Sequence, residues 1–455
     1  MPRIVPPAPP RHAAPLPFWE LIRRLSKSTI SIWGQPAYEI MVAQGERFGL
    51  RNILVNDPEG IRHIAAGDAK GLYVKSITTR RLVRAASGNG LVLSEGEAWR
   101  RQRRMLAPAF TPAHVGLFLP HFAEAANALI AGLEGQARVN LSKAFQEAAL
   151  DAACRALFSM PIGGHGRRLA SLARAYVKGP GRPRIWDSLA RSEGQFAFMT
   201  PGRFLFRWLW RKEVRRVIAA RLQHLDGRAG RRQDLLDLLI AAKDPETGAG
   251  LSDQDLQDQT STFIAAGFET TARVLFWTCY LLTLAPEEQA RLRAEVKAFP
   301  PDRVQSLADI NRWPRLRQVL LESMRLYPPA PLYTRMSTGS DEVCGRIVEA
   351  GTLVMISPWL VHRHRRLWPD PDAFDPDRFE GKPQDYLSNG AYIPFGVGPR
   401  TCIGASFALA EASLILAKML ERFEIALDDE RQITPISIIT IMPDIEPWFR
   451  LTPAG

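Results

Sequence analysis

The chain contains 455 residues, of which 46% are hydrophobic and 23% are charged. This balance is ordinary for a globular protein, and it excludes an intrinsically disordered or membrane-embedded chain. The formal net charge is +12, and the length allows a large hydrophobic core. The longest apolar stretch, Val274 to Ala285, is too short to span a bilayer, so we expect no transmembrane anchor.

Seven prolines occur in the first 17 residues, where the order of basic, apolar and small residues of a secretory signal is missing. We expect residues 1–17 to form a semi-rigid arm on the surface. Four cysteines are far apart in the sequence and form no C-x-x-C pair, which argues against a disulfide framework and a structural zinc site. These features predict a soluble protein of the reducing cytoplasm.

Helical patterning dominates from Phe18 onward, with short β-branched runs between clusters of glycine and proline and without repeats or long linkers. We therefore predict a single, mainly α-helical domain over residues 18–455. Its longest helix is expected to begin after the N-cap Ser252 and to end before Pro286. With about 1.5 Å per residue, its roughly 33 residues would extend about 50 Å, enough to cross the molecule.

Two further helices are predicted in the C-terminal half of the chain. One covers Arg315 to Leu326 and stops at a pair of prolines. The other covers Ser406 to Phe423 and is apolar on nearly every face, so we expect it to be buried. A glycine-rich loop precedes this second helix.

That loop reads Phe395-Gly396-Val397-Gly398-Pro399-Arg400-Thr401-Cys402-Ile403-Gly404. A cysteine just before a helix N-terminus meets the positive end of the helix dipole, which lowers the pKa of its thiol. Thiolate is a ligand of haem iron, the glycines allow close approach of a flat cofactor, and Arg400 offers a cation to a carboxylate. Taken alone, the loop is equally compatible with a buried structural cysteine.

The loop resembles the haem-binding signature F-x-x-G-x-R-x-C-x-G of the cytochrome P450 superfamily, with matches at Phe395, Gly398, Arg400, Cys402 and Gly404. Three further motifs occur earlier in the chain, in the order that the family shows. The resemblance therefore extends from the first strand region to the C-terminus. It implies a mainly α-helical cytochrome P450 fold with small β-sheets. It also implies a haem b cofactor between the long central helix and the helix after the loop, with Cys402 as the iron ligand.

The central helix contains Ala266-Gly267-Phe268-Glu269-Thr270-Thr271. Glycine inside a helix costs about 1 kcal/mol relative to alanine, and a threonine hydroxyl can bond the carbonyl four residues back, so the segment favours a local distortion. It resembles the oxygen-activating segment of the family. The resemblance implies that Ala266 and Gly267 leave room for dioxygen, that Thr270 holds it with a water molecule, and that Glu269 relays protons. A solvated glutamate beside a packing glycine is the alternative.

Arg273 follows Glu269 by four residues, the spacing of an ion pair on one helical face. Such a pair would tether the acid or gate the path of protons. Arg273 is a departure from the pattern of the family.

Glu322 and Arg325 lie three residues apart on one predicted helical face, and Arg378 lies in an extended segment bent by proline. An isolated E-x-x-R is by default a surface ion pair. These residues resemble the E-x-x-R motif of the family and its partner arginine. The resemblance implies a buried network that fixes the loop bearing Cys402.

Trp99 and Arg103 match the W-x-x-x-R motif of the family, and their spacing of one helical turn brings both to one face. Arg335 aligns with another arginine that the family uses. For all three residues the resemblance implies contact with the haem propionates. An exposed arginine near a strand is the alternative for Arg335.

Residues 203–232 contain ten Lys and Arg against two acidic residues, a local charge of +8, and aromatic residues are interleaved among them. This segment predicts contact with an anionic membrane surface, attraction of an acidic substrate, or simply a solvated cationic face. Nucleic-acid binding is disfavoured because no recognised module accompanies the charge.

A second basic cluster consists of Arg100, Arg101, Arg103 and Arg104. In the family fold it would lie on the cysteine side of the haem, where it would dock an acidic electron donor. The chain contains no G-x-G-x-x-G motif for a dinucleotide. We therefore expect electrons from a separate ferredoxin or flavodoxin with its reductase.

Together the motifs predict a haem-thiolate monooxygenase. It would use dioxygen and two external electrons to hydroxylate or epoxidise a lipophilic small molecule, such as a fatty acid, terpenoid or aromatic compound. One alternative is a peroxide-using or rearranging enzyme of the same fold, which Glu269 and Thr270 disfavour. The other is a non-catalytic haem sensor, which the lack of an attached signalling domain disfavours.

The substrate pocket implied by the resemblance has mainly apolar or small side chains. Its expected lining is the segment Thr78–Leu93 with Phe263, Ala266, Thr271, Pro331, Leu332, Tyr333, Thr334, Ser437 and Ile438.

Overall fold

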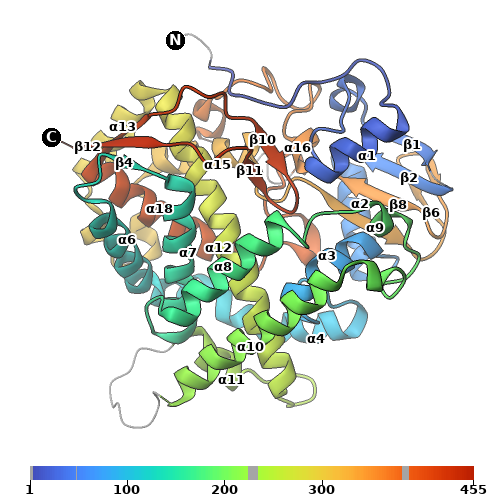
Figure 1. Cartoon of the computed structure of the whole chain (residues 1–455), viewed down its shortest axis with the longest axis horizontal. Coiled ribbons are helices and arrows are strands. Elements are labelled where there is room, and N and C mark those ends of the chain that lie inside the picture. Colours follow the sequence, from blue (N-terminus) through green and yellow to red (C-terminus); the bar gives the residue numbers. More distant parts are fainter. Residues whose placement is uncertain (1–3, 48, 224–233, 382–388, 455) are drawn as a thin grey trace.

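A computed structural model gives the structure of the chain and describes residues 4–47, 49–223, 234–381 and 389–454. Helices are packed around the long helix α12 (Asp253–Leu284), and a β-sheet lies at one side of them (Figure 1). The larger surrounding helices are α6 (Leu119–Leu133), α7 (Leu141–Phe158), α8 (Gly164–Lys178), α10 (Pro201–Gln223), α13 (Pro286–Ala298), α15 (Pro314–Leu326) and α18 (Ala405–Arg422). The shorter ones are α1 (Phe18–Lys27), α2 (Pro58–Ala69), α3 (Ile77–Ser87), α4 (Gly96–Leu106), α5 (Pro112–Leu117), α9 (Ile185–Leu189), α11 (Leu235–Ala241), α14 (Leu307–Ile310) and α16 (Pro358–Val361).

Helix α12 has the bounds that its sequence predicts. The Ser252 hydroxyl accepts the N–H of Asp255 at 3.1 Å, and the Asp255 carboxylate accepts the N–H of Ser252 at 3.3 Å, which caps the helix. The helix ends at Leu284, and Pro286 begins α13. Helices α15 and α18 lie within one residue of their predicted limits. The prediction of a mainly α-helical architecture is therefore confirmed.

The largest sheet has the order β1 (Val42–Arg47), β2 (Leu50–Val55), β8 (Leu353–Ile356), β5 (Tyr333–Ser337) and β3 (Tyr73–Lys75). Only β2 and β8 are parallel among its neighbouring pairs. Strand β5 pairs Arg335 with Lys75 on β3, which brings two cations to one edge of the sheet. The smaller sheets contain β4 (Arg138–Val139), β12 (Phe449–Pro453) and β9 (Phe423–Leu427), then β10 (Pro435–Ser437) and β11 (Ile441–Pro443), and then β6 (Asp341–Val343) and β7 (Arg346–Val348).

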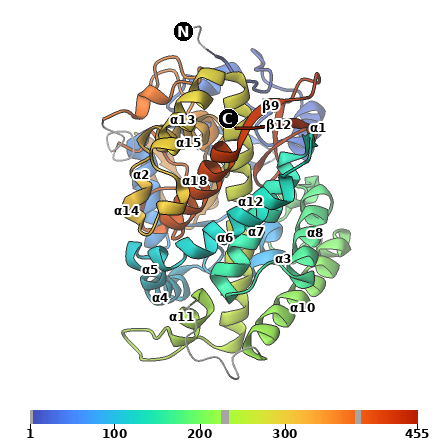
Figure 2. The same cartoon turned by 90° about the vertical axis from the view of Figure 1, so that its left-hand side faces the viewer.

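The core lies along α12, whose residues from Val274 to Leu282 are all buried. Trp277 stacks on Tyr327, just after α15, with ring centroids 4.1 Å apart. On the other side, Phe407 of α18 meets Phe122 of α6 edge-on at 4.6 Å. Figure 2 shows α12 passing through the middle of the helical layers, with α18 and α6 on the side turned toward the viewer. Helix α12 is thus a fixed axis on which the surrounding elements are positioned.

The proline-rich N-terminal segment runs along the body of the protein. Phe374 donates its N–H to the carbonyl of Ile4 at 2.9 Å, and the Tyr327 hydroxyl donates to the carbonyl of Pro7 at 2.8 Å. Within the described ranges, even the longest and most apolar helices fall short of what crossing a bilayer requires.

Candidate active site

The loop before α18 is closed by a hydrogen bond from the N–H of Cys402 to the carbonyl of Phe395, at 2.8 Å. Gly396 and Gly398 have φ angles of +77° and +71°, a region that favours glycine. A Cβ on Gly398 would also lie only 2.9 Å from the Cβ of Ala65 on α2. The signature glycine is therefore required both by its backbone conformation and by close packing.

The Cys402 side chain is accessible, although α18 behind it is buried from Ala410 to Leu420. The thiol is therefore accessible, while the protein around it removes most of its solvation. Burial raises the pKa of Cys402, and the N–H of Gly404 and the guanidinium of Arg103 lower it by less. This corrects the expectation from the helix dipole, because desolvation outweighs the helix terminus here. A coordinated metal ion would deprotonate the thiol outright.

Helix α12 borders open space at its oxygen-activating segment. Ala266 is exposed and Thr270 half-buried, whereas Phe268 between them is buried. A Cβ on Gly267 would meet no heavy atom within 4 Å. The Thr270 hydroxyl donates to the carbonyl of Ala266 at 2.6 Å, the bond that its sequence position predicts.

Phe110 connects this face of α12 with the cysteine loop. Its ring centroid is 5.1 Å from that of Phe263 on α12. A Cβ added to Gly404 would lie 3.9 Å from the same ring. The open face of α12 at Ala266 and Gly267, which we call its cleared face, and the accessible cysteine therefore belong to one region of the interior.

Cations gather next to this region, at the edge of the sheet formed by β3 and β5. Arg335 and Arg400 each form an ion pair with Asp68 at 2.6 Å, and Arg400 also pairs with Glu95. Burial, together with these two guanidinium groups, lowers the pKa of Lys75 to about 7. Three cationic side chains thus share two carboxylates.

Two of the predicted propionate contacts lie beside this cluster. The guanidinium of Arg400 is stacked over the Trp99 ring, 4.2 Å from its centroid. Arg103 instead donates to the carbonyl of Thr401 at 2.9 Å, next to the cysteine. The accessible thiol, the cleared helix face and the cationic cluster fit a flat iron cofactor that carries carboxylates.

Glu269 is held in a buried network that reaches three elements. Its Oε1 accepts from Arg273 Nε at 2.9 Å and from the Thr440 hydroxyl at 3.4 Å, and its Oε2 accepts from Gln146 at 3.1 Å. Arg273 also donates to Ser142 of α7 at 2.9 Å. The acid and its helical neighbour thus form the ion pair that their spacing predicts. Both oxygens of the carboxylate are engaged by these partners.

Glu322, Arg325 and Arg378 come together although they lie up to 56 residues apart in the sequence. Arg325 Nε and Nη2 donate to the two oxygens of Glu322 at 2.7 and 2.8 Å, and both side chains have no exposed surface. Arg378 Nε lies 3.5 Å from Glu322. The structure therefore brings these residues into one buried cluster.

Glu411 is a buried acid of this region that sequence reasoning missed. It lies on α18 and accepts a hydrogen bond from Thr271 of α12 at 3.4 Å, while its second oxygen is buried without a partner within the part of the chain that the structure describes. Burial raises its pKa well above the ordinary value. A charged residue on an otherwise apolar helix face was the signal that could have found it.

We predict that Glu411→Gln stabilises the protein at neutral pH. Because the folded state keeps the proton that the unfolded state releases, the wild-type free energy of unfolding falls by about 1.4 kcal/mol per pH unit between the two pKa values. With glutamine at this position, the free energy of unfolding has no such decrease with pH. Urea unfolding from about pH 5 to pH 8 should therefore show a midpoint difference that grows with pH. Glu421→Gln, on the same helix, controls for the removed carboxyl, and a constant difference would contradict the prediction.

The predicted pocket residues are divided between the interior and contacts with other elements. Phe263 and Leu332 are half-buried, and Pro331 and Ile438 are buried. The Ser437 hydroxyl accepts from Thr29 at 3.1 Å, and the Thr271 hydroxyl is directed to α18. Helix α3, from the segment Thr78–Leu93, joins β5 through hydrogen bonds of Ser76 and Thr79 with Thr334 at 2.7 and 2.8 Å.

Known proteins match most of the chain. The family model for cytochrome P450 matches residues 49–444. Cyclooctat-9-en-7-ol 5-monooxygenase of Streptomyces melanosporofaciens is 31% identical over 408 residues, which are 87% of this chain and 86% of that protein. The chain belongs to the cytochrome P450 family. It is a haem-thiolate monooxygenase, which uses dioxygen, electrons from a redox partner and a lipophilic substrate.

Other cytochromes P450 extend the comparison. Human cytochrome P450 4F8 is 30% identical over 413 residues, which are 84% of this chain and 77% of that protein. The heme domain of cytochrome P450DA superposes with a TM-score of 0.77 and 26% identity, and the match covers 100% of this chain and 98% of that one. A second cytochrome P450 crystal structure has a TM-score of 0.79 at 24% identity, with 99% and 100% coverage. The cytochrome P450 fold predicted from the motifs is thereby confirmed.

Proposed function

We propose that this cytochrome P450 hydroxylates an uncharged, lipophilic alcohol of the terpenoid class, with haem b as its cofactor and Cys402 as the iron ligand. One observation carries the assignment of the reaction centre. The accessible thiol of Cys402 and the face of α12 cleared at Ala266 and Gly267 border the same interior region. When bound there, haem would supply the activation of dioxygen, so that one oxygen atom enters a C–H bond and the other leaves as water with two external electrons and two protons.

The chain's own residues would bind the cofactor and manage protons. Arg335, Arg400 and Lys75 would bind carboxylates of the cofactor, and the ion pairs of the first two with Asp68 keep them in position. Phe395, Gly398 and Gly404 shape the loop. The Thr270 hydroxyl would turn from the Ala266 carbonyl toward dioxygen and water. Glu269 would accept or donate a proton only after exchanging one of its present partners for water.

The substrate class follows from charge and from a relative. The arginines of α3 are already paired, Arg81 with the buried Asp187 at 2.8 Å and Arg84 with Glu193 at 2.5 Å. A substrate carboxylate would have to compete with these partners. The first relative described above is named for an uncharged alcohol, cyclooctat-9-en-7-ol. Both observations favour an uncharged alcohol over a fatty acid.

Electrons would come from a separate small ferredoxin or flavodoxin. Helix α4 presents Arg100, Arg101 and Arg104 at the surface on the side of the cysteine loop, where Arg103 reaches Thr401. Each of these arginines also lies near a carboxylate: Arg100 near Glu97, Arg104 near Glu246, and Arg101 near Asp255. An acidic donor would exchange those contacts for its own.

A spectral titration tests the substrate class. We expect cyclooctat-9-en-7-ol to shift the Soret band of the ferric protein from low to high spin, and a long-chain fatty acid to leave it unchanged. The matching long-chain alcohol separates the effect of charge from that of shape. A shift with the fatty acid alone would overturn the proposal for an uncharged substrate.

A further inference from the structure

Large apolar side chains protrude from the surface at the start of α10. Phe204, Leu205 and Trp208 are each 56% to 59% exposed, and Phe198, in the preceding turn, is 77% exposed. The opposite side of the same helix is anchored in the core by Phe206, which stacks between Tyr176 and Trp210. The exposed side chains are therefore not needed to hold α10 in place, and their exposure requires another reason.

Basic side chains continue this exposed side toward the end of the helix. Positions 204, 208, 212 and 215 lie along one stripe of a helix with 3.6 residues per turn. Lys212 lies over the ring of Trp208, with its Nζ 4.8 Å from the centroid. Helix α10 contains seven Lys and Arg residues and only one acid, Glu213. The rest of the basic segment predicted from the sequence, residues 224–232, lies outside the described residues.

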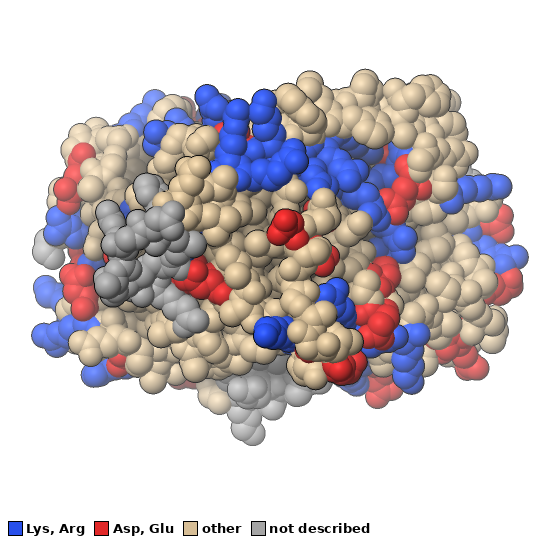
Figure 3. All heavy atoms as spheres, turned by 90° about the horizontal axis from the view of Figure 1, so that it is seen from below, with Lys and Arg blue, Asp and Glu red and all other residues tan. Residues whose placement is uncertain are grey.

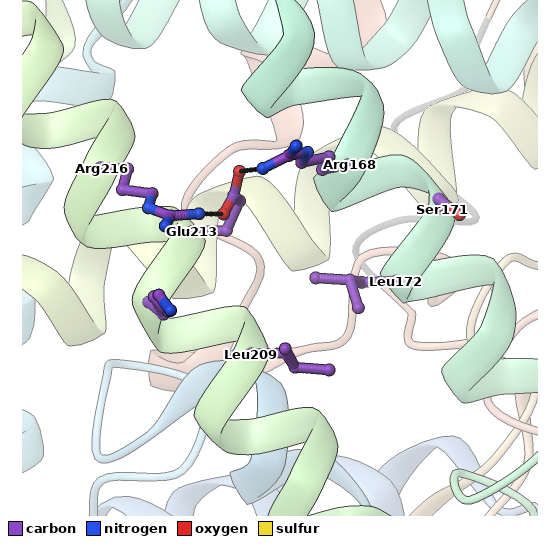
Figure 4. Close-up of a pocket in the computed structure, with 7 residues that line it drawn as sticks. Arg168, Ser171, Leu172, Leu209, Glu213 and Arg216 are labelled. Atoms are coloured by element: carbon purple, nitrogen blue, oxygen red, sulfur yellow. Dashed lines mark hydrogen bonds and ion pairs between the residues drawn. The ribbon is translucent and has the colours of Figure 1, made fainter.

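A hollow of about 320 Å³ between α8 and α10 adds a further cation to this surface. Leu172 and Leu209 line it, together with Arg168, Lys212, Glu213 and Arg216. Figure 4 shows Glu213 between Arg168 and Arg216, with the two leucines facing one another between the helices. Glu213 is buried and already accepts from His165 and Arg216 at 2.8 and 2.9 Å. The hollow thus has an apolar floor and an excess of positive charge.

We name the α10 face the surface formed by Phe198, Phe204, Leu205, Trp208, Arg168, Lys212, Arg215 and Arg216. Seen from below the molecule of Figure 1, lysine and arginine side chains form a band along one edge (Figure 3). An acidic protein would match this charge but would gain little from protruding aromatics. A second copy of the chain would bring like charges together. A bilayer with anionic headgroups satisfies both the aromatic and the basic parts.

We propose that the α10 face docks the protein onto anionic phospholipid membranes. Phe198, Phe204, Leu205 and Trp208 enter the headgroup region, and the basic side chains meet the lipid phosphates. The binding is peripheral and reversible. It keeps the enzyme next to a phase in which lipophilic compounds are concentrated.

Sedimentation of the haem-loaded protein with vesicles tests this proposal. We expect binding to vesicles of phosphatidylglycerol and phosphatidylcholine at low salt, and none to phosphatidylcholine alone. Lys212→Gln combined with Arg215→Gln should raise the dissociation constant by about 30-fold, since each basic residue near an anionic surface contributes about 1 kcal/mol. Phe204→Ser combined with Trp208→Ser should weaken binding to a similar degree.

Two matched variants control for general loss of an exposed tryptophan or charge. Trp19→Ser removes a tryptophan that is 74% exposed on α1, and Arg346→Gln removes an exposed cation on β7. Both should bind vesicles as the wild type does. If the aromatic double variant binds vesicles as strongly as the wild type, the interaction depends on unspecific charge alone and the proposal is overturned. The proposal would also be overturned if the wild type did not bind vesicles at low salt. The same holds if the wild type binds no vesicles but self-associates, and this self-association is lost in the aromatic double variant.

Discussion

Arg325→Ala is expected to yield protein without stable haem. Alanine would leave the carboxylate of Glu322 fully buried, with Arg378 at 3.5 Å and the N–H of Asp375 at 2.9 Å as its remaining partners. Removing one member of a buried ion pair costs about 3–5 kcal/mol. The carbonyls of His362, Pro371 and Ala373 would also lose the donor that now binds them at 2.7 to 2.8 Å.

The damage would reach the cysteine loop through His362. Burial, with the nearby guanidinium of Arg325, lowers the pKa of His362 to about 3, so its ring is neutral and can accept a hydrogen bond. Its Nε2 accepts the N–H of Ile393 at 2.8 Å, two residues before Phe395. Arg325 therefore binds the backbone carbonyl of His362, and the His362 side chain in turn binds Ile393 just before the cysteine loop.

Haem content per protein and the midpoint of urea unfolding measure this effect. Arg23→Ala is the matched control, because Arg23 pairs with Glu20 at the same three-residue spacing on an exposed surface. It should retain haem and stability. Glu322→Gln combined with Arg325→Met, which removes both charges, should be less damaging than Arg325→Ala alone. Normal haem content in Arg325→Ala would contradict the structural role of the network.

The sequence predicts helices and short-range pairs well because their determinants are local. The limits of α12 follow from Ser252 and Pro286, and the pair of Glu269 with Arg273 follows from one helical turn. Gln146 and Thr440 complete that network from positions 123 and 171 residues away from Glu269. Only the packing of α7 and the β10–β11 turn against α12 brings them there, and no local pattern encodes that packing.

Charge balance and desolvation are equally hidden in the sequence. The motifs indicate Arg335 and Arg400, but the carboxylate that both share is Asp68, which belongs to no motif. The helix-terminus argument gives the wrong direction for the pKa of Cys402, because burial depth depends on the whole fold. Which residues come together is thus partly predictable from spacing, whereas their electrostatics is not.

Cys402→Ser is expected to abolish the thiolate signature in the spectrum of the reduced, carbon monoxide-bound protein, together with all monooxygenase activity. Serine keeps the size and the backbone hydrogen bond to Phe395, so the loop should still form. Its hydroxyl is a far weaker acid than a thiol, so it stays protonated and gives the iron none of the electron donation of a thiolate. The expected result is therefore a change of ligation and not a loss of fold, which circular dichroism distinguishes.

The other cysteines show why only this residue is expected to have the effect. Cys154 and Cys279 are buried, and burial raises the pKa of both thiols. Cys344 is the second exposed cysteine, and it lies in the turn between β6 and β7 with its Sγ 3.4 Å from Asp57. Cys344→Ser should leave the spectrum and the activity unchanged. A thiolate spectrum that survives in Cys402→Ser and disappears in Cys344→Ser would place the iron at Cys344, and the proposed site would have to be abandoned.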